Sequence, residues 1–299
     1  MNQHFRAYGL TIDSELPLVE LQSGHRAGEA DVTIRLGKLD AAELDALPQA
    51  GPVLRADNRQ LLLEVPEVAR FLVSDGSEIC IEPADGIDED SIRLFLLGSA
   101  LGALLMQRGL LLLHGNAVRI GEHCLVCVGD SGAGKSTLAA GFMQRGYEVL
   151  ADDIVPVDGE GLAIPGYARI KLWRDVADRL DIDTSELRRI RPELEKYNLP
   201  LPQLRDEQPV PVKWVYILHE AHVDEVEIEH MRGMDRLRPL VDNTYRLRFA
   251  RGMGLRQSHF QQCAIVGRNA SVARVRRPRH GFRLDELIDR LLQDLAEHP

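Results

Sequence analysis

Residues 114–153 read HGNAVRIGEHCLVCVGDSGAGKSTLAAGFMQRGYEVLADD, and this stretch decides the fold. Its centre, residues 129–136, matches the phosphate-binding pattern G-x-x-x-x-G-K-[ST] without a mismatch. An apolar run at 124–128 precedes the motif, and a helix-like run at 135–144 follows it. Strand, glycine-rich loop and helix therefore stand in the order that phosphate binding requires.

The chemistry of this pattern is specific. Glycines let successive backbone N–H groups curl around a phosphate, and the following helix points its positive end at the same anion. Lys135 is predicted to reach the outer phosphates of a nucleoside triphosphate, and Ser136 to hold a Mg2+ ion. The predicted nucleotide-binding residues are Gly129, Asp130, Ser131, Gly132, Ala133, Gly134, Lys135, Ser136 and Thr137.

A pair of carboxylates, Asp152 and Asp153, ends the strand predicted for residues 147–151. A carboxylate beside a phosphate loop can bind Mg2+ or accept the proton of an attacking hydroxyl. Neighbouring residues of a strand face opposite ways, so we expect the two carboxylates to have different roles. The alternative is that they cap a turn, where aspartate is common.

The composition is that of an ordinary globular protein, with 44% hydrophobic and 27% charged residues. A net charge of -10 and a pI near 5.5 argue against a general nucleic-acid binder, which needs a surplus of lysine and arginine. No apolar run approaches the roughly 18 residues that a membrane span needs, and the first ten residues lack the core of a signal peptide. We therefore expect a cytoplasmic protein with neither a nucleic-acid nor a membrane partner.

Three further patterns allow more than one interpretation. Cys124 and Cys127 form C-x-x-C, but positions three apart on a strand face opposite sides, which favours buried thiols over a redox or zinc site. Residues 219–222, HEAH, suggest a metal site, but they do not match the zinc motif H-E-x-x-H. Their position in a predicted strand also keeps the two imidazoles apart, which disfavours a metal site. The basic run 274–280 would hold an acidic partner or form a solvated connector, and charge runs favour the connector.

Residues 1–88 are predicted to form a small, mostly β accessory module. Short strand signals alternate with turn formers along it. The predicted strands are 5–12, 31–36, 60–65, 70–73 and 78–81. Nothing in this module has catalytic spacing, so we expect it to serve substrate delivery or dimerisation, and a homo-oligomer stays open.

Residues 89–299 are predicted to form the catalytic domain. The hydrophobic periodicity predicts helices at 88–107, 135–144, 175–180, 185–197, 234–241 and 284–295. It predicts strands at 110–113, 116–120, 124–128, 147–151, 212–219 and 223–230, and a final strand pair within 264–275. The proline-rich stretch 199–212 is predicted as an extended connector or mobile loop.

His114, the loop 129–136 and the pair 152–153 together resemble the catalytic domain of the HPr kinase/phosphorylase family. The spacing and Gly146, which closes the loop helix, contribute to the resemblance, which extends more loosely over 95–299. It implies an α/β P-loop kinase domain of the HPr kinase and phosphoenolpyruvate carboxykinase type, with a mixed sheet. Members phosphorylate serine on a small carrier protein, and relatives in peptide-biosynthesis clusters act on precursor peptides, including lasso peptides.

The resemblance also implies roles for single residues. Lys135 contacts phosphate, Ser136 holds Mg2+, and Asp153 is the general base. Asp152 is then a second predicted metal ligand, and His114 is the histidine that orients Asp153 or adds positive charge near the phosphates. The alternative to these catalytic roles is that His114 is a buried histidine whose ring nitrogens form hydrogen bonds with backbone groups. The implied cofactors are ATP and Mg2+.

The sequence also departs from this family. Thr137 stands where a glutamate usually follows the loop serine, and 165–173 occupies the region of a glycine-rich segment that carries a metal-binding glutamate. With the different N-terminal module, these departures argue against the carrier protein HPr as substrate and against the reverse phosphorylase reaction. No motif marks the arginine that would clamp the transferred phosphate; the candidates are Arg246 and Arg251, followed by Arg169.

The sequence thus predicts an ATP- and Mg2+-dependent P-loop serine kinase whose acceptor is a peptide or small protein, with a ribosomal peptide precursor among the options. One alternative is a nucleotide-binding regulatory module with little or no transfer, and another is a small-molecule kinase. No L-S-G-G-Q stretch is present, which disfavours an ABC-type ATPase. The absence of H-R-D and D-F-G disfavours a protein-kinase fold.

Overall fold

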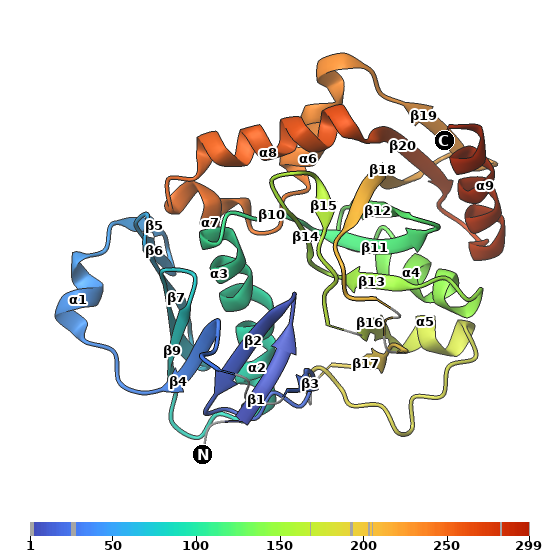
Figure 1. Cartoon of the computed structure of the whole chain (residues 1–299). Helices are drawn as coiled ribbons and strands as arrows, with labels where there is room; N and C mark the ends of the chain where they lie inside the picture. The colour runs from blue at the N-terminus through green and yellow to red at the C-terminus, as the bar shows by residue number, and fades with distance from the viewer. Residues whose placement is uncertain are drawn as a thin grey trace. The chain divides into compact units, whose positions relative to one another are not determined.

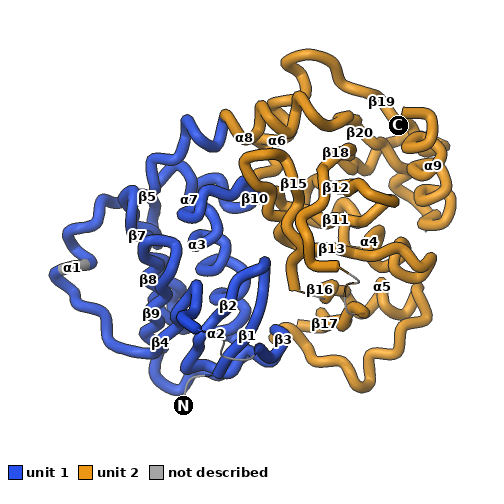
Figure 2. The backbone as a smooth tube through the Cα atoms, viewed as in Figure 1, with its two compact units in different colours: residues 1–112, 245–260 blue, residues 113–244, 261–299 orange. Residues whose placement is uncertain are grey.

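The computed structural model divides into two compact units (Figure 2). The first comprises residues 1–112 and 245–260, and the second comprises 113–244 and 261–299. The structure describes residues 3–24, 28–167, 169–191, 194–202, 204, 206–281 and 283–298. Among these residues, no helix is both long and apolar enough to cross a membrane.

The first unit is built on a mixed sheet with the strand order β3-β1-β2-β4-β9-β8-β7-β6-β5 (Figure 1). Its strands are β1 (Gln3–Ala7), β2 (Leu10–Ser14), β3 (Gln22–Ser23), β4 (Val32–Leu36), β5 (Gln49–Gly51), β6 (Leu54–Ala56), β7 (Gln60–Val65), β8 (Ala69–Ser74) and β9 (Glu78–Pro83). Its helical segments are α1 (Ala41–Ala46), α2 (Glu89–Phe95), the π-helical η1 (Leu96–Ala100), α3 (Leu101–Gln107) and α7 (Leu247–Gly252). The unit therefore groups α2 and α3 with the N-terminal strands. A division into compact units does not test where an accessory module ends and a catalytic domain begins, so the domain boundary at residue 88 stays a prediction.

One predicted strand of this unit is wrong. The stretch 5–12 forms two strands, because Tyr8 and Gly9 take φ values of 55° and 72° and reverse the chain between β1 and β2. Two consecutive positive φ values are typical of a tight hairpin turn. The helix predicted at 88–107 is confirmed in place, with η1 as a π-helical segment in its middle.

The second unit contains a mixed sheet in which β12, β18 and β20 run parallel (Figure 1). β11 lies antiparallel between β12 and β13. The strands are β11 (Gly115–Ile120), β12 (His123–Gly129), β13 (Val149–Asp152), β14 (Val155–Val157), β15 (Leu162–Ala163), β16 (Arg169–Trp173), β17 (Lys196–Pro200), β18 (Val210–Ala221), β19 (Glu227–His230) and β20 (Ser271–Pro278). The helices are α4 (Lys135–Gln144), α5 (Arg174–Arg179), η2 (Gly233–Arg236), α6 (Leu237–Asp242) and α9 (Leu284–Glu297). β10 (Leu111–Leu113) and α8 (Arg256–Asn269) each contain a point where the chain passes from one unit to the other.

The hydrophobic core of the second unit is closed by α4 and α9. Phe142 of α4 and Ile288 and Leu291 of α9 are fully buried in the same cluster. Gly141 lets the two helices approach, because a Cβ there would lie 2.7 Å from a methyl carbon of Leu284. The apolar stripe that predicted a helix at 284–295 is thus the face of α9 that covers the core.

Two predictions in this unit are wrong. None of the described residues in the helix predicted at 185–197 is helical: 185–191 and 194–195 are turns and irregular structure, and 196–197 begin strand β17, which pairs along its length with β16. The strand pair predicted at 264–275 is the second half of α8 followed by β20. In both places a partner distant in the sequence decides the structure, and local periodicity carries no information about that partner.

Gly115 generates a stability prediction. A Cβ at this position would lie 2.3 Å from the backbone oxygen of Cys127, so β11 and β12 would have to separate locally. We predict that Gly115→Ala lowers the free energy of unfolding by about 1–3 kcal/mol, as other overpacked sites do. Urea denaturation measures this change. Gly159→Ala is the matched control, since a Cβ there meets no described atom within 4 Å; equal losses in the two variants would contradict the prediction.

Candidate functional site

The glycine-rich loop connects the end of β12 to the start of α4. Gly129, Gly132 and Gly134 take φ values of 144°, 87° and 94°, which side chains with a Cβ rarely adopt. At Gly129 a Cβ would also lie 2.5 Å from the backbone oxygen of Leu218 in β18. The glycines of the motif are therefore required both by backbone conformation and by the close approach of β18.

Lys135 begins α4 and is nearly buried, with 8% of its surface exposed. Its Nζ donates hydrogen bonds to the backbone oxygens of Gly129, at 2.8 Å, and Asp130, at 3.0 Å. Burial lowers the pKa of this ammonium, while the nearby carboxylates of Asp152 and Asp153 raise it. Because hydrogen bonds between charged groups are the stronger ones, an anion in the loop would compete well for this ammonium.

Ser136 and Asp152 form the next layer of the site. The Ser136 hydroxyl lies 3.1 Å from each oxygen of the Asp152 carboxylate, and the backbone N–H of Lys171 donates to the same carboxylate. Burial, followed by the charge of Asp153, raises the pKa of Asp152 to about 6. A cation would relieve both effects. Hydroxyl and carboxylate oxygens are also the hard ligands that Mg2+ takes, so the two residues fit that ion.

Asp153 has a different environment from its neighbour. The Lys171 Nζ lies 2.8 Å from one oxygen of its carboxylate, and the Nδ1 of His114 lies 3.4 Å from the other. The same Nδ1 lies 3.0 Å from the backbone oxygen of Asp153, so the backbone contact that was the alternative for His114 is present as well. Burial would raise the pKa of Asp153, but the ammonium of Lys171 and then His114 hold it at about 2. Asp153 also takes a φ of 76°, a strained conformation for a residue other than glycine. The site therefore holds an ionised carboxylate in a fixed position beside the loop.

Sequence reasoning missed several partners in this cluster. The pairing of Lys171 with Asp153 depends on the position of β16 and has no local signal in the sequence. Lys196 of β17 adds a second amine, whose pKa is lowered by burial and by Lys171. Asn116 is fully buried, its amide donates to the backbone oxygen of Lys135, and its Oδ1 has no hydrogen-bond partner among the described residues. A polar residue inside the apolar strand 116–120 was the available signal for Asn116.

Arg277, at the end of β20, contacts the phosphate loop. Its Nε donates to the backbone oxygen of Ala133 at 3.0 Å, and its guanidinium pairs with Glu220. Its side chain is only 20% exposed, so the solvated connector predicted for the basic run 274–280 is wrong at this residue. The pairing also explains Glu220 in the HEAH stretch without a metal ion.

The three arginines predicted to clamp the transferred phosphate, Arg246, Arg251 and Arg169, lie in surroundings other than the glycine-rich loop. Arg246 and Arg251 belong to the first compact unit, where Arg246 precedes α7 with a φ of 47°. Arg169 is buried in the second unit with its guanidinium 4.7 Å from the ring centre of Tyr167. A role for these three in clamping phosphate stays a prediction.

Cys124 and Cys127 are buried thiols, the interpretation that the strand pattern favoured over a redox or zinc site. Both side chains are fully buried on β12. Burial raises the pKa of Cys124 to about 12 and also raises the pKa of Cys127. Thiols that stay protonated at neutral pH are poor nucleophiles and poor metal ligands, so the C-x-x-C pair contributes to packing.

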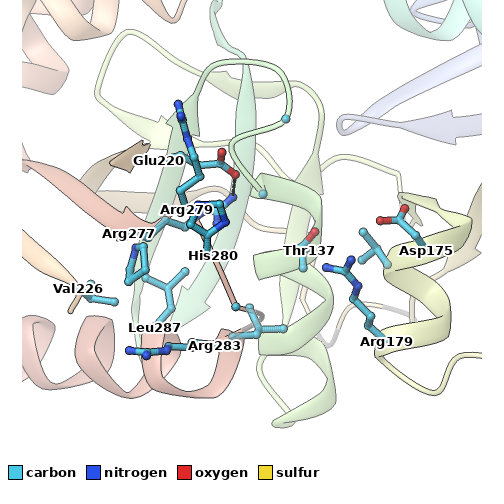
Figure 3. A pocket seen from close by; sticks show the side chains of 16 residues that line it. Thr137, Asp175, Arg179, Glu220, Val226, Arg277, Arg279, His280, Arg283 and Leu287 are labelled. Atoms are coloured by element: carbon cyan, nitrogen blue, oxygen red, sulfur yellow. Dashed lines mark hydrogen bonds and ion pairs between the residues drawn. The ribbon is translucent and has the colours of Figure 1, made fainter. Parts of the chain in front are cut away.

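A cavity of about 540 Å³ opens beside the loop (Figure 3). Thr137 of α4 lies between its two polar walls: Arg179 and Asp175 come from α5, and Arg277 and Glu220 come from the strand ends. The apolar residues of the lining are Val176, Val226, Leu284 and Leu287. Four arginines, Arg179, Arg277, Arg279 and Arg283, stand in the same lining against two carboxylates. A concave site with this surplus of positive charge favours an anionic ligand.

Comparisons with known proteins give little further information. No protein-family model matches the chain, and no curated protein matches it. Among solved structures, the chain is similar to the HPr(Ser) kinase/phosphatase from Coxiella burnetii, with 14% identity over 62% of this chain and 97% of that chain. The TM-score of this match is 0.31, which is too low to carry an argument about fold or residue roles. The assignment of an α/β fold with mixed sheets therefore rests on the strands and helices of the structure alone.

Proposed function

We propose that this chain is an ATP- and Mg2+-dependent kinase that phosphorylates a serine-type hydroxyl on a peptide or small protein. The observation that carries the proposal is the division of labour between two adjacent carboxylates. The carboxylate of Asp152 accepts a hydrogen bond from Ser136, whereas the carboxylate of Asp153 accepts one from the ammonium of Lys171. One carboxylate thus serves the donor side, and the other serves the acceptor.

On the donor side, the loop and the ammonium of Lys135 hold the phosphates of ATP. Ser136 and Asp152 would hold Mg2+, which would supply positive charge against the phosphates. The cavity takes the nucleoside, because its lining includes Gly132, Gly134 and Thr137. Arg277 contacts the loop at Ala133 and also lines the cavity, so its guanidinium would add positive charge beside the bound phosphates.

On the acceptor side, Asp153 positions the attacking hydroxyl and takes its proton. The hydroxyl oxygen bonds to the γ-phosphorus, and the bond from that phosphorus to the β–γ bridging oxygen breaks. Lys171 and His114 keep the carboxylate ionised and fix its orientation. The side chains of Asp153 and His114 are 28% and 35% exposed, so a hydroxyl on a macromolecule can reach them. A small-molecule acceptor is the alternative that the same opening admits.

The first prediction separates transfer from binding. Asp153→Asn should retain ATP affinity while phosphoryl transfer falls at least ~100-fold, the usual loss when a catalytic base is removed. Lys135→Ala should weaken both ATP binding and phosphoryl transfer, because the ammonium of Lys135 lies against the backbone of the loop. Calorimetric titration with Mg2+ and ATP measures binding, and radiolabelled ATP with an array of serine-containing peptides measures transfer.

Two exposed residues serve as controls, each with the same charge as the site residue it is compared with. Asp235→Asn and Lys38→Ala should leave both quantities unchanged, since both side chains are exposed and neither contacts the site. Equal transfer by the parent and by Asp153→Asn would refute the role of Asp153. Binding of ATP without transfer by the parent to any peptide would favour the regulatory module instead.

The second prediction concerns pH. In the parent, Asp153 has a pKa of about 2 and stays ionised across the physiological range, so it causes no acidic fall in activity there. In Lys171→Met, the ammonium is lost and burial raises the pKa of Asp153. The kcat/KM of this variant should fall as the pH drops from about 8 to about 5, because the carboxylate gains a proton.

Lys196→Met is the matched comparison for the pH profile. Lys196 acts on Asp153 through charge alone and more weakly than Lys171, so its removal should move the acidic limb less. If Lys171→Met lowers activity by the same factor at every pH, the ammonium does not set the protonation of Asp153, and its part in the proposal is wrong.

The third prediction tests the nucleoside cavity. Val176 is partly buried on α5 and lines the cavity, so Val176→Trp should fill it. We expect at least a ~10-fold loss of ATP affinity, equal to about 1.4 kcal/mol, with the affinity for Mg2+ and inorganic tripolyphosphate unchanged. Val19→Trp, at an exposed valine, is the control. Equal losses for ATP and tripolyphosphate would show that the cavity does not take the nucleoside.

A further inference from the structure

A second cluster of titratable side chains lies where β19 ends and α9 ends. His230 closes β19, and Asp294 and His298 lie one helical turn apart at the end of α9. One ligand atom from each of the three lies within 4.8 Å of the others. The His230 Nε2 is 3.0 Å from Asp294 Oδ2, and the His298 Nδ1 is 3.4 Å from Asp294 Oδ1. None of the three lines the cavity beside the phosphate loop.

The central carboxylate requires a positive partner. The Asp294 side chain is only 7% exposed, and no lysine or arginine of the described chain forms an ion pair with it. A buried carboxylate without a cation is costly, so the charge must come from a protonated imidazole or from a metal ion. The two imidazole rings lie 4.0 Å apart between centres, so both stand beside the same carboxylate.

The surroundings orient these side chains as outer ligands do around a metal. The Tyr216 hydroxyl donates to Asp294, and the Ser271 hydroxyl lies 3.0 Å from His230 Nδ1. If Nδ1–H donates to Ser271, the lone pair of Nε2 faces the carboxylate. The indole N–H of Trp214 fixes the backbone oxygen of His298 at 2.9 Å. Hydrogen bonds of this kind set the tautomer and direction of metal ligands.

We propose that His230, Asp294 and His298 bind a divalent transition-metal ion of the zinc type. Two imidazoles and one carboxylate are a ligand set that zinc takes in proteins, with ligand distances of about 2.0–2.2 Å. The Nδ1 of His298 is also 3.1 Å from the backbone oxygen of Asp294, so this ring, whose side chain is 45% exposed, would have to turn from that contact to bind the ion. The ion would pin the end of α9 to the sheet formed by β18, β19 and β20.

This proposal does not depend on the kinase function, and its test uses binding alone. The full chain is stripped of metal, the chelator is removed, and ZnCl2 is titrated in excess Mg2+ so that the phosphate-loop site is not available to zinc. We expect one zinc ion per chain and a rise in the unfolding temperature on binding. Co2+ in place of zinc should give visible absorption typical of a low-symmetry site with nitrogen and oxygen ligands.

Single substitutions assign the ion to these residues. His298→Ala and His230→Gln should each weaken zinc binding at least ~10-fold, the loss expected when a ligand or its support is removed. His222→Ala, at an exposed histidine just after β18, should bind as the parent does. His298 is exposed, so its removal cannot fail merely through loss of folding. Absence of stoichiometric zinc binding by the parent, or equal binding by His298→Ala and His222→Ala, would overturn the proposal.

Discussion

The candidate site depends on two positions where backbone meets backbone, Gly115 against Cys127 and Gly129 against Leu218. These contacts set how closely β11, β12 and β18 approach. Because β11 runs antiparallel to both β12 and β13, its first residues lie beside the last residues of its neighbours. The register pairs Gly115 with Val128 and Asn116 with Asp152, so His114, the phosphate loop and the carboxylate pair meet at one end of the sheet. The chemistry of the site is therefore a consequence of strand register.

Within that geometry, electrostatics separates two residues that are neighbours in the sequence. Asp152 has a raised pKa because it is buried beside another carboxylate, and Asp153 has a lowered one because Lys171 lies against it. Pairs of carboxylates whose environments move their pKa values apart are typical of sites that assign different roles to each. A cation at Asp152 would complete the separation, since it would remove the repulsion between the two charges.

The sequence predicted the parts of this site that are local. The loop motif, the helix that follows it and the Asp152–Asp153 strand end are contiguous in the chain, and the amphipathic period of α9 is regular. The parts that it missed are not local. Lys171 reaches Asp153 only because β16 lies beside β13, and Arg277 reaches the loop only because β20 pairs with β18. A basic run gives no sign of which of its arginines will be buried. Similarly, residues 264–275 carry β-branched side chains that favour a strand, yet their first half continues a 14-residue helix.

Two elements connect the cavity beside the glycine-rich loop to the cluster of His230, Asp294 and His298. α9 contributes Leu284 and Leu287 of its first turn to the cavity and Asp294 of its last turn to the cluster. β20 begins at Ser271, which orients His230, and carries Arg277 at its other end against the loop. A cation at the cluster would hold one end of both elements, and the nucleoside would contact the other end of both. The same two elements, α9 and β20, therefore join the proposed ion site to the wall of the cavity.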